Sequence, residues 1–213
     1  YITLPHPRPK VNAMTSQEIF TASETMRNVS FAVVDFETTG LNPETDRIVQ
    51  LAAVIVNGEG HIVDSFDTIV KPESPTEYQH GAEHIHGISA EQVSGGMPLR
   101  KALERLWSIN AGHVFTAHNA AFDLGFLHAE SKRVGLEGHV DVHVDTLELA
   151  RRTTGADTTR KHNLFALCEH YGIKRDKEHD AKSDATATAQ LLMHLIKELG
   201  VETPDQVAEL FTP

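Results

Sequence analysis

The first half of the chain carries the apolar pattern of three β-strands. Residues 31–37 are apolar on both faces apart from two acids, as expected of a strand buried between two layers. Residues 47–56 and 61–70 are predicted as two further strands. Between them lie residues 57–60 (NGEG), which indicate a tight hairpin turn. The pattern therefore predicts a three-stranded antiparallel meander.

Beyond the meander, helical and strand patterns alternate. The helical patterns cover residues 99–109, 120–133, 164–171 and 182–199, and the strand patterns cover residues 113–117 and 139–145. The last helix places four leucines on one stripe: Leu191, Leu192, Leu195 and Leu199. This order predicts an α/β fold with a mixed five-stranded sheet, an antiparallel meander plus parallel strands, flanked by helices.

The positions of these patterns divide the chain into three parts. Its 213 residues are enough for one domain with an extension. We expect an N-terminal arm over residues 1–29, partly disordered or with one short helix over residues 15–26. The main domain is expected over residues 30–200, followed by a C-terminal tail over residues 201–213.

The composition indicates the cellular compartment in which the protein is expected. Cys168 is the single cysteine, which excludes an internal disulfide framework and fits a reducing compartment. No apolar run is long enough to span a bilayer, and the first ten residues lack the apolar stretch of a signal peptide. We therefore expect a cytoplasmic protein without a membrane partner.

The net charge of −11, from 19 Lys and Arg against 30 Asp and Glu, opposes tight binding to phosphates. Such binding depends on counterions released by basic side chains. The objection weakens if several acids are metal ligands, because bound cations then attract nucleic acid locally. Weak and transient substrate binding is the expectation.

Four acids lie on faces that the pattern assigns to the interior. Asp35 and Glu37 are two apart on the first strand, so both point to one face. Asp123 and Asp184 each share a helical stripe with apolar residues. Taken singly, an inward acid at a helix start is more often an N-cap or a salt-bridge partner. Four such acids together indicate a cluster that needs a cation.

Oxygen ligands favour hard cations, so we expect two divalent cations, Mg²⁺ or Mn²⁺. Two such ions roughly 3.5–4 Å apart hold the attacking and leaving oxygens of a phosphodiester. His179 lies five residues before Asp184, and its ordinary pKa suits a general base. Taken alone, a histidine is more often a core or surface residue.

Three motifs around these residues resemble one family. They are residues 34–41 (VDFETTGL), 117–123 (AHNAAFD) and 179–185 (HDAKSDA), the last in the His-x4-Asp form. Together they resemble the DnaQ-like, or DEDDh, exonucleases, which include the proofreading epsilon subunits of bacterial DNA polymerase III. The resemblance covers residues 31–199, and it makes residues 30–200 a DEDDh exonuclease domain with an RNase H-like fold.

The resemblance implies a metal-dependent 3′→5′ exonuclease. It would hydrolyse terminal phosphodiesters of single-stranded nucleic acid and release nucleoside 5′-monophosphates. In this family the acid matching Asp35 bridges both metals, those matching Glu37 and Asp184 complete the first metal site, and that matching Asp123 supports the second. His179 would deprotonate the attacking water.

Residues 82–88 (AEHIHGI) resemble the family segment that contacts the last nucleotide. The implied pocket at the 3′ end consists of the Thr38 backbone, Leu41, Ile85, His86 and Phe122. The alternative for His86 is that it caps a turn.

Two weaker signals remain outside the motifs. Residues 139–145 place two histidines and two acids on one face, which would suit a transition metal. Ligands on one strand rarely close a tetrahedron, so a strand near the sheet edge with one wet face is expected instead. Asp145 itself matches a structural acid of the family. Residues 160–163 (RKHN) form a basic loop for which phosphate contact and simple solvation are equally favoured.

The residues leave several functions open. A DNA exonuclease of the proofreading or repair type is favoured, and an RNA or short-oligonucleotide exonuclease is the alternative. A non-catalytic, polymerase-associated subunit is a third hypothesis, disfavoured by the intact acids and histidine. A DNA polymerase or a sliding clamp is a candidate partner, with residues 206–211 as a weak clamp-binding peptide. The sequence does not determine the oligomeric state.

Overall fold

The computed structural model describes residues 25–73, 78–154 and 161–212. Its centre is a mixed sheet in the order β4-β3-β2-β1-β5-β6. The strands are β1 Ser30–Thr38, β2 Ile48–Asn57, β3 Ile62–Lys71, β4 Met97–Pro98, β5 Val114–Ala117 and β6 His143–Asp145. β1, β2 and β3 form the antiparallel meander, whereas β4, β5 and β6 pair in parallel with their neighbours.

The predicted mixed α/β sheet is confirmed, with two corrections. The sheet has six strands rather than five, because the two residues of β4 pair with Val70 and Lys71. Two residues are too short to leave a periodic pattern. The predicted strand over residues 139–145 is wrong in length, since β6 covers only His143–Asp145, the three residues that pair with β5. Directly before residue 139, Gly138 packs so closely on Trp107 that a Cβ at this position would lie 2.3 Å from the indole ring.

The helices are α2 Glu83–His86, α3 Ala90–Ser94, α4 Leu99–Asn110, α5 Ala120–Arg133, α6 Thr146–Thr154, α7 Leu164–Tyr171 and α8 Ala181–Glu198. Short 3-10 helices cover Met26–Asn28 (η1) and Pro204–Leu210 (η2). The four predicted helices agree with α4, α5, α7 and α8 to within a residue, while α2, α3 and α6 were not predicted. None of the helices in the described part of the chain combines the length and apolar character needed to cross a bilayer.

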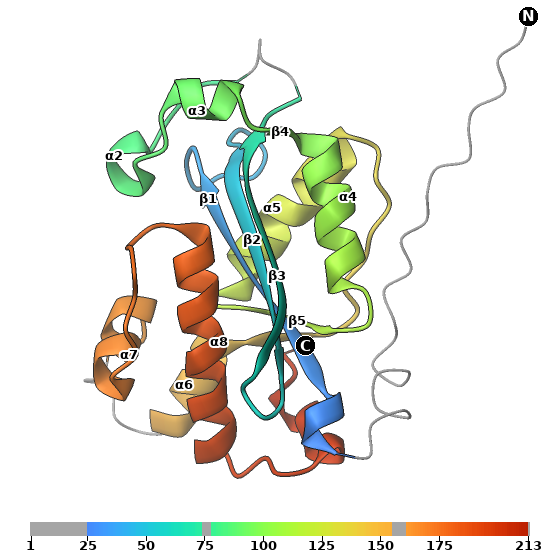
Figure 1. Ribbon diagram of the computed structural model, residues 1–213, viewed down its shortest axis with the longest axis vertical. Coiled ribbons are helices and arrows are strands. Elements are labelled where there is room, and N and C mark those ends of the chain that lie inside the picture. Colours follow the sequence, from blue (N-terminus) through green and yellow to red (C-terminus); the bar gives the residue numbers. More distant parts are fainter. Residues whose placement is uncertain (1–24, 74–77, 155–160, 213) are drawn as a thin grey trace, which may run out of the picture.

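The helices cover both faces of the sheet (Figure 1), with α6, α7 and α8 on one side and α4 and α5 on the other. The strand β1 divides its side chains between these layers. Phe31 and Val33 pack in the core beneath α8, whereas Val34 and Phe36 pack in the core beneath α4. This alternation turns Asp35 to the α8 side. The expected burial of β1 on both faces is confirmed.

The C-terminal segment packs onto the domain. Val207 and Leu210 in η2 are fully buried in the same core as α8, and Thr212 bridges to His143. Gln206 is engaged in a capping box with Thr203. Residues 206–211 would therefore have to leave the core to bind a clamp as an extended peptide. The predicted helix over residues 15–26 lies almost wholly outside the described residues.

Candidate active site

The end of β1 and the start of α8 bring three potential ligands together. Glu37 is the register partner of Gln50 on β2 and is 8% exposed. One ligand atom each of Glu37, His179 and Asp184 lies within 4.8 Å of the other two. Within the described residues this is the group of acid, histidine and cysteine side chains that could share an ion.

Asp35 and Asp123 extend this cluster. Asp123, in the first turn of α5, is 3% exposed, as its place on an apolar stripe predicts. Burial raises the pKa of Asp35 well above its usual range, and the nearby charge of Asp123 raises it further. Glu37 and Asp184 act on Asp35 in the same direction. The four acids picked out from the sequence therefore converge on one place.

The cluster is electrostatically unfavourable when every acid is charged. Burial raises the pKa of Glu37 to about 7, with the charges of Asp184 and Asp180 adding to the effect. Burial likewise raises the pKa of Asp123, although hydrogen bonds from its own backbone N–H and that of Phe36 oppose the rise. A cation placed among these acids would reverse the repulsion.

One basic side chain reaches into the cluster. Arg175, in the loop between α7 and α8, donates from Nη2 and Nε to Asp184 Oδ1 at 2.7 and 3.0 Å. The Arg175 and Asp184 side chains are only 10% and 9% exposed. Burial raises the pKa of Asp184, and the Arg175 guanidinium opposes that rise. Arg175 was not predicted from the sequence, because residues 174–179 (KRDKEH) have the composition of an ordinary charged loop.

Gln50 clamps the entry to α8. Its Oε1 accepts a hydrogen bond from Ala181 N at 3.1 Å, and its Nε2 donates to Asp180 Oδ2 at 3.4 Å. Asp180 in turn caps α8 by accepting from Ser183 N at 3.1 Å. His179 immediately precedes this clamp, and its side chain is exposed beside the buried acids. Gln50 was also missed, because its partners lie about 130 residues away in sequence.

Asp145 fixes the entry to α5. Its carboxylate accepts hydrogen bonds from Asn119 N at 2.9 Å, Ala120 N at 3.1 Å and Leu147 N at 2.9 Å. This is the structural role expected of it, and it holds the helix start that carries Asp123. No transition-metal group forms along residues 139–145, all of which the structure describes.

The residues assigned to the 3′-end pocket have different surroundings. Leu41 is 84% exposed and Ile85 is 50% exposed, which leaves both apolar side chains available to a nucleotide. Thr38 is buried, and Phe122 packs against Phe126 with ring centroids 4.9 Å apart. Their role in binding substrate stays a prediction.

His86 is buried and braces its own loop. Its Nδ1 accepts from Ile88 N at 2.9 Å, so Nε2 carries the proton and donates to the Gly81 carbonyl at 3.1 Å. Both ring nitrogens are engaged by backbone, as the turn-capping alternative predicted. A polar contact with substrate would require one of these bonds to break.

Three helix entries share an uncommon backbone conformation. Among the described residues, the non-glycine positions with positive φ are Ala82 (56°), Asn119 (69°) and His179 (52°). They directly precede or cap α2, α5 and α8, the helices that carry Ile85, Asp123 and Asp184. A left-handed residue costs energy when it has a Cβ. The strain therefore gathers at the segments that present the candidate site.

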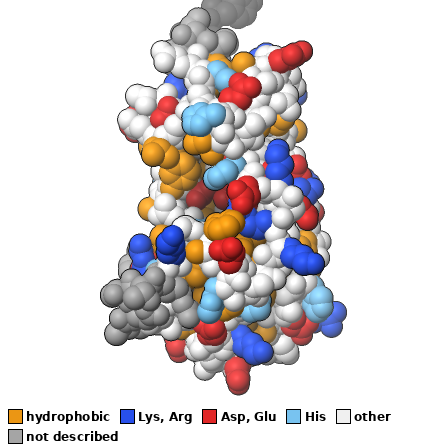
Figure 2. Space-filling view, turned by 90° about the vertical axis from the view of Figure 1, so that its left-hand side faces the viewer, with side chains coloured by type: hydrophobic (Ala, Val, Ile, Leu, Met, Phe, Trp, Pro, Cys, Tyr) orange, Lys and Arg blue, Asp and Glu red, His pale blue; other side chains and the backbone are white. Residues whose placement is uncertain are grey.

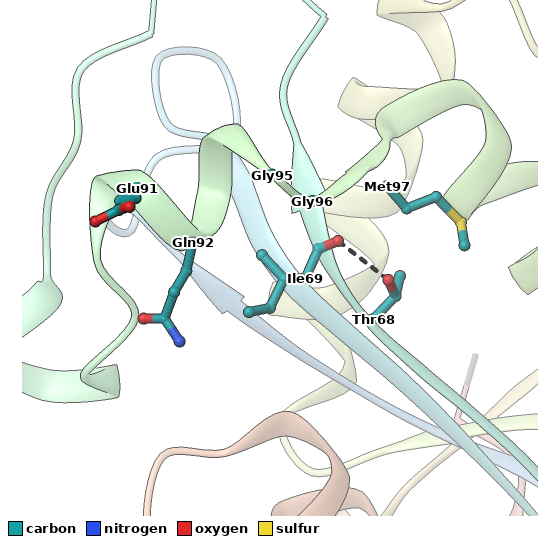
Figure 3. A pocket seen from close by; sticks show the side chains of 7 residues that line it. All are labelled: Thr68, Ile69, Glu91, Gln92, Gly95, Gly96 and Met97. Atoms are coloured by element: carbon teal, nitrogen blue, oxygen red, sulfur yellow. Dashed lines mark hydrogen bonds between the residues drawn. The ribbon is translucent and has the colours of Figure 1, made fainter.

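The molecular surface agrees with this arrangement. The side of the molecule that carries α7 and α8 is turned to the viewer in Figure 2, where acidic, histidine and apolar side chains gather around a hollow near the middle. A separate hollow of about 500 Å³ lies between α3 and the end of β3 (Figure 3). Its only acid is Glu91, which is exposed, so it lacks the ligands for a metal centre.

Comparison with known proteins agrees with the motifs. The RNase_T exonuclease family model matches residues 32–192. PolC-type DNA polymerase III of Listeria welshimeri is 35% identical over 173 residues, 81% of this chain, and that of Oceanobacillus iheyensis is 36% identical over 170 residues, 80% of this chain. The chain spans only 12% of the length of these relatives.

Solved structures share the fold. E. coli Exonuclease I in complex with a dT13 oligonucleotide has a TM-score of 0.69 at 20% identity, covering 81% of this chain and 42% of its own. The nuclease domain of 3′hExo, a DEDDh family member bound to rAMP, has a TM-score of 0.68 at 18% identity, covering 79% and 92%. Exonuclease X with 5′ overhanging duplex DNA has a TM-score of 0.60 at 24% identity, covering 84% and 98%. With its three motifs in place and the family model matched over most of its length, the chain belongs to the RNase T/DEDDh family of 3′→5′ exonucleases, hydrolases of phosphodiester bonds.

Proposed function

We propose that this chain removes nucleotides one at a time from the 3′ end of single-stranded nucleic acid, with DNA favoured, by a two-metal mechanism. The observation that carries the proposal is the convergence of four inward acids with His179 at the meeting point of β1, α5 and α8. The products would be nucleoside 5′-monophosphates.

The donor set fits hard divalent cations. Asp35, Glu37, Asp123 and Asp184 supply carboxylate oxygens, the ligands that Mg²⁺ and Mn²⁺ prefer. Burial raises the pKa values of these four acids, and neighbouring acids add to the rise for Asp35, Glu37 and Asp123, so a bound cation would stabilise their charged forms. When bound, two such cations supply the positive charge that polarises the scissile phosphodiester and stabilises its transition state.

His179 is proposed to act as the general base. An imidazole nitrogen would accept the proton of the attacking water, which requires a neutral ring near pH 7. The Gln50 clamp holds the backbone just after His179, and the exposed ring is free to reach a water beside Glu37 and Asp184. Leu41 and Ile85 would pack against the terminal nucleotide through their exposed apolar side chains.

The relatives support DNA as the preferred substrate without excluding RNA. Exonuclease I and Exonuclease X are each described in complex with DNA, and the curated relatives are DNA polymerases. We therefore propose a proofreading or repair role, with a DNA polymerase as the candidate partner. The second candidate, a 3′ exonuclease of RNA, is favoured by the rAMP bound to 3′hExo.

A gel assay tests the proposal. DNA and RNA of one sequence, single-stranded and labelled at the 5′ end, are incubated with Mg²⁺, Mn²⁺ or EDTA. We expect a metal-dependent ladder that shortens from the 3′ end, faster for DNA, and no ladder with Asp184→Asn. Faster shortening of RNA would favour the second candidate. An unshortened substrate in the presence of bound metal would contradict exonuclease activity by the isolated chain.

A further inference from the structure

Arg175 places a permanent positive charge inside the carboxylate cluster. Both of its donated hydrogen bonds end on one atom, Asp184 Oδ1. A guanidinium stays protonated at any pH at which the protein is folded. Lys177, the other basic side chain that acts on Glu37, is exposed and therefore better screened.

The charge of Arg175 reaches beyond its hydrogen-bond partner. Asp35 and Glu37 also experience it, in addition to the directly bonded Asp184. Arg175 therefore supplies positive charge to the same acids that would hold the metal. The same charge repels any divalent cation that approaches these acids.

The backbone of Asp184 does not depend on Arg175 for its position. It lies in the first turn of α8, its backbone N–H bonds to the Asp180 carbonyl at 2.9 Å, and the clamp from Gln50 fixes that turn. The contact with Arg175 instead occupies Oδ1, one of the two oxygens that Asp184 can offer to a metal. We therefore favour a role for Arg175 in competing with a metal ion for the Asp184 carboxylate over a role in orienting that carboxylate.

We propose that Arg175 is an internal cation that stabilises the metal-free cluster and competes with divalent metal for Asp184, so that it weakens metal binding. This inference rests on the proposed function, because it assumes that the four acids bind metal. Arg175 would then limit metal occupancy and would not contact the substrate.

The test measures Mn²⁺ binding directly, without substrate. Isothermal titration compares the wild-type protein with Arg175→Gln and with Lys174→Gln, an exposed neighbour that loses the same charge. We expect Arg175→Gln to bind Mn²⁺ about tenfold more tightly, which corresponds to about 1.4 kcal/mol. Lys174→Gln should bind like the wild type, and Arg175→Lys, which keeps the charge, should stay closer to the wild type than to Arg175→Gln.

Thermal unfolding gives a second readout. In EDTA, Arg175→Gln should melt below the wild type, and saturating Mn²⁺ should close the gap. If Arg175→Gln is unfolded without metal, Mn²⁺ should restore its near-ultraviolet circular dichroism, and failure to do so would overturn the inference. Equal or weaker Mn²⁺ binding by folded Arg175→Gln would overturn it too. If the wild type itself binds no Mn²⁺, the metal-dependent function fails, which is a different result.

Discussion

Replacing Glu37 by Gln keeps the shape of the side chain and removes a charge that its surroundings oppose. Burial first, then Asp184, raise the pKa of Glu37 from its ordinary value of 4.5 to about 7. The folded protein thus holds this proton more tightly than the unfolded chain. The stability that the folded protein gains from this tighter proton binding is fully present below pH 4.5 and is lost as the pH rises through about 7.

The size of the effect follows from the two pKa values. The rise in the pKa of Glu37 from 4.5 to about 7 corresponds to about 3 kcal/mol of unfolding free energy. The wild type without metal has lost this stabilisation at pH 8. Glu37→Gln cannot lose it, so the variant should be more stable by about 3 kcal/mol at pH 8 and by less than about 1 kcal/mol at pH 5. For a chain of this length, the gap at pH 8 is about 6–12 °C in Tm.

Urea unfolding in EDTA between pH 5 and 8 measures this gap. Glu169→Gln, at an exposed position on α7, is the matched control and should follow the wild type at every pH. Saturating Mn²⁺ should stabilise the wild type more than Glu37→Gln, which also loses turnover. A stability gap that does not change with pH, or a wild type that is the more stable protein at pH 8 in EDTA, would refute the reasoning.

Three further substitutions test the site. His179→Ala should slow single-turnover cleavage by roughly 10²–10⁴-fold with Mn²⁺ binding intact by titration calorimetry; lost binding would make His179 a ligand instead. Gln50→Ala removes two hydrogen bonds to the start of α8, so it should lower both the unfolding free energy, by about 1–3 kcal/mol, and kcat. An unchanged kcat in steady-state assays would contradict the role of Gln50 in holding the start of α8. Leu41→Ala should raise KM without moving Tm, because Leu41 is 84% exposed; a lower Tm would show a packing role.

Much of the fold was predictable because it follows from local periodicity. The alternation along β1 and the hairpin signal at residues 57–60 were enough for the meander. The extents of the short strands β4 and β6 were not predictable, because each strand is defined by the partner strand with which it pairs. No pattern within a segment reveals where its partner strand ends.

The acids of the site were predictable for the same reason, since each stood out on an apolar face of its own element. Arg175, Gln50 and the bracing role of His86 were not. Each depends on hydrogen bonds to backbone or carboxylate groups that only the folded chain brings near. Residue type alone does not distinguish a solvated arginine from one buried against an acid.

The left-handed helix entries bear on how this sequence can change over time. At Ala82 a Cβ in that conformation costs about 1 kcal/mol. Glycine would remove this cost in the folded state, but it would also raise the conformational entropy of the unfolded chain. β-branched residues are strongly disfavoured there. A substitution at Ala82 therefore changes the energy of the backbone at the start of α2 without adding or removing a reactive side chain.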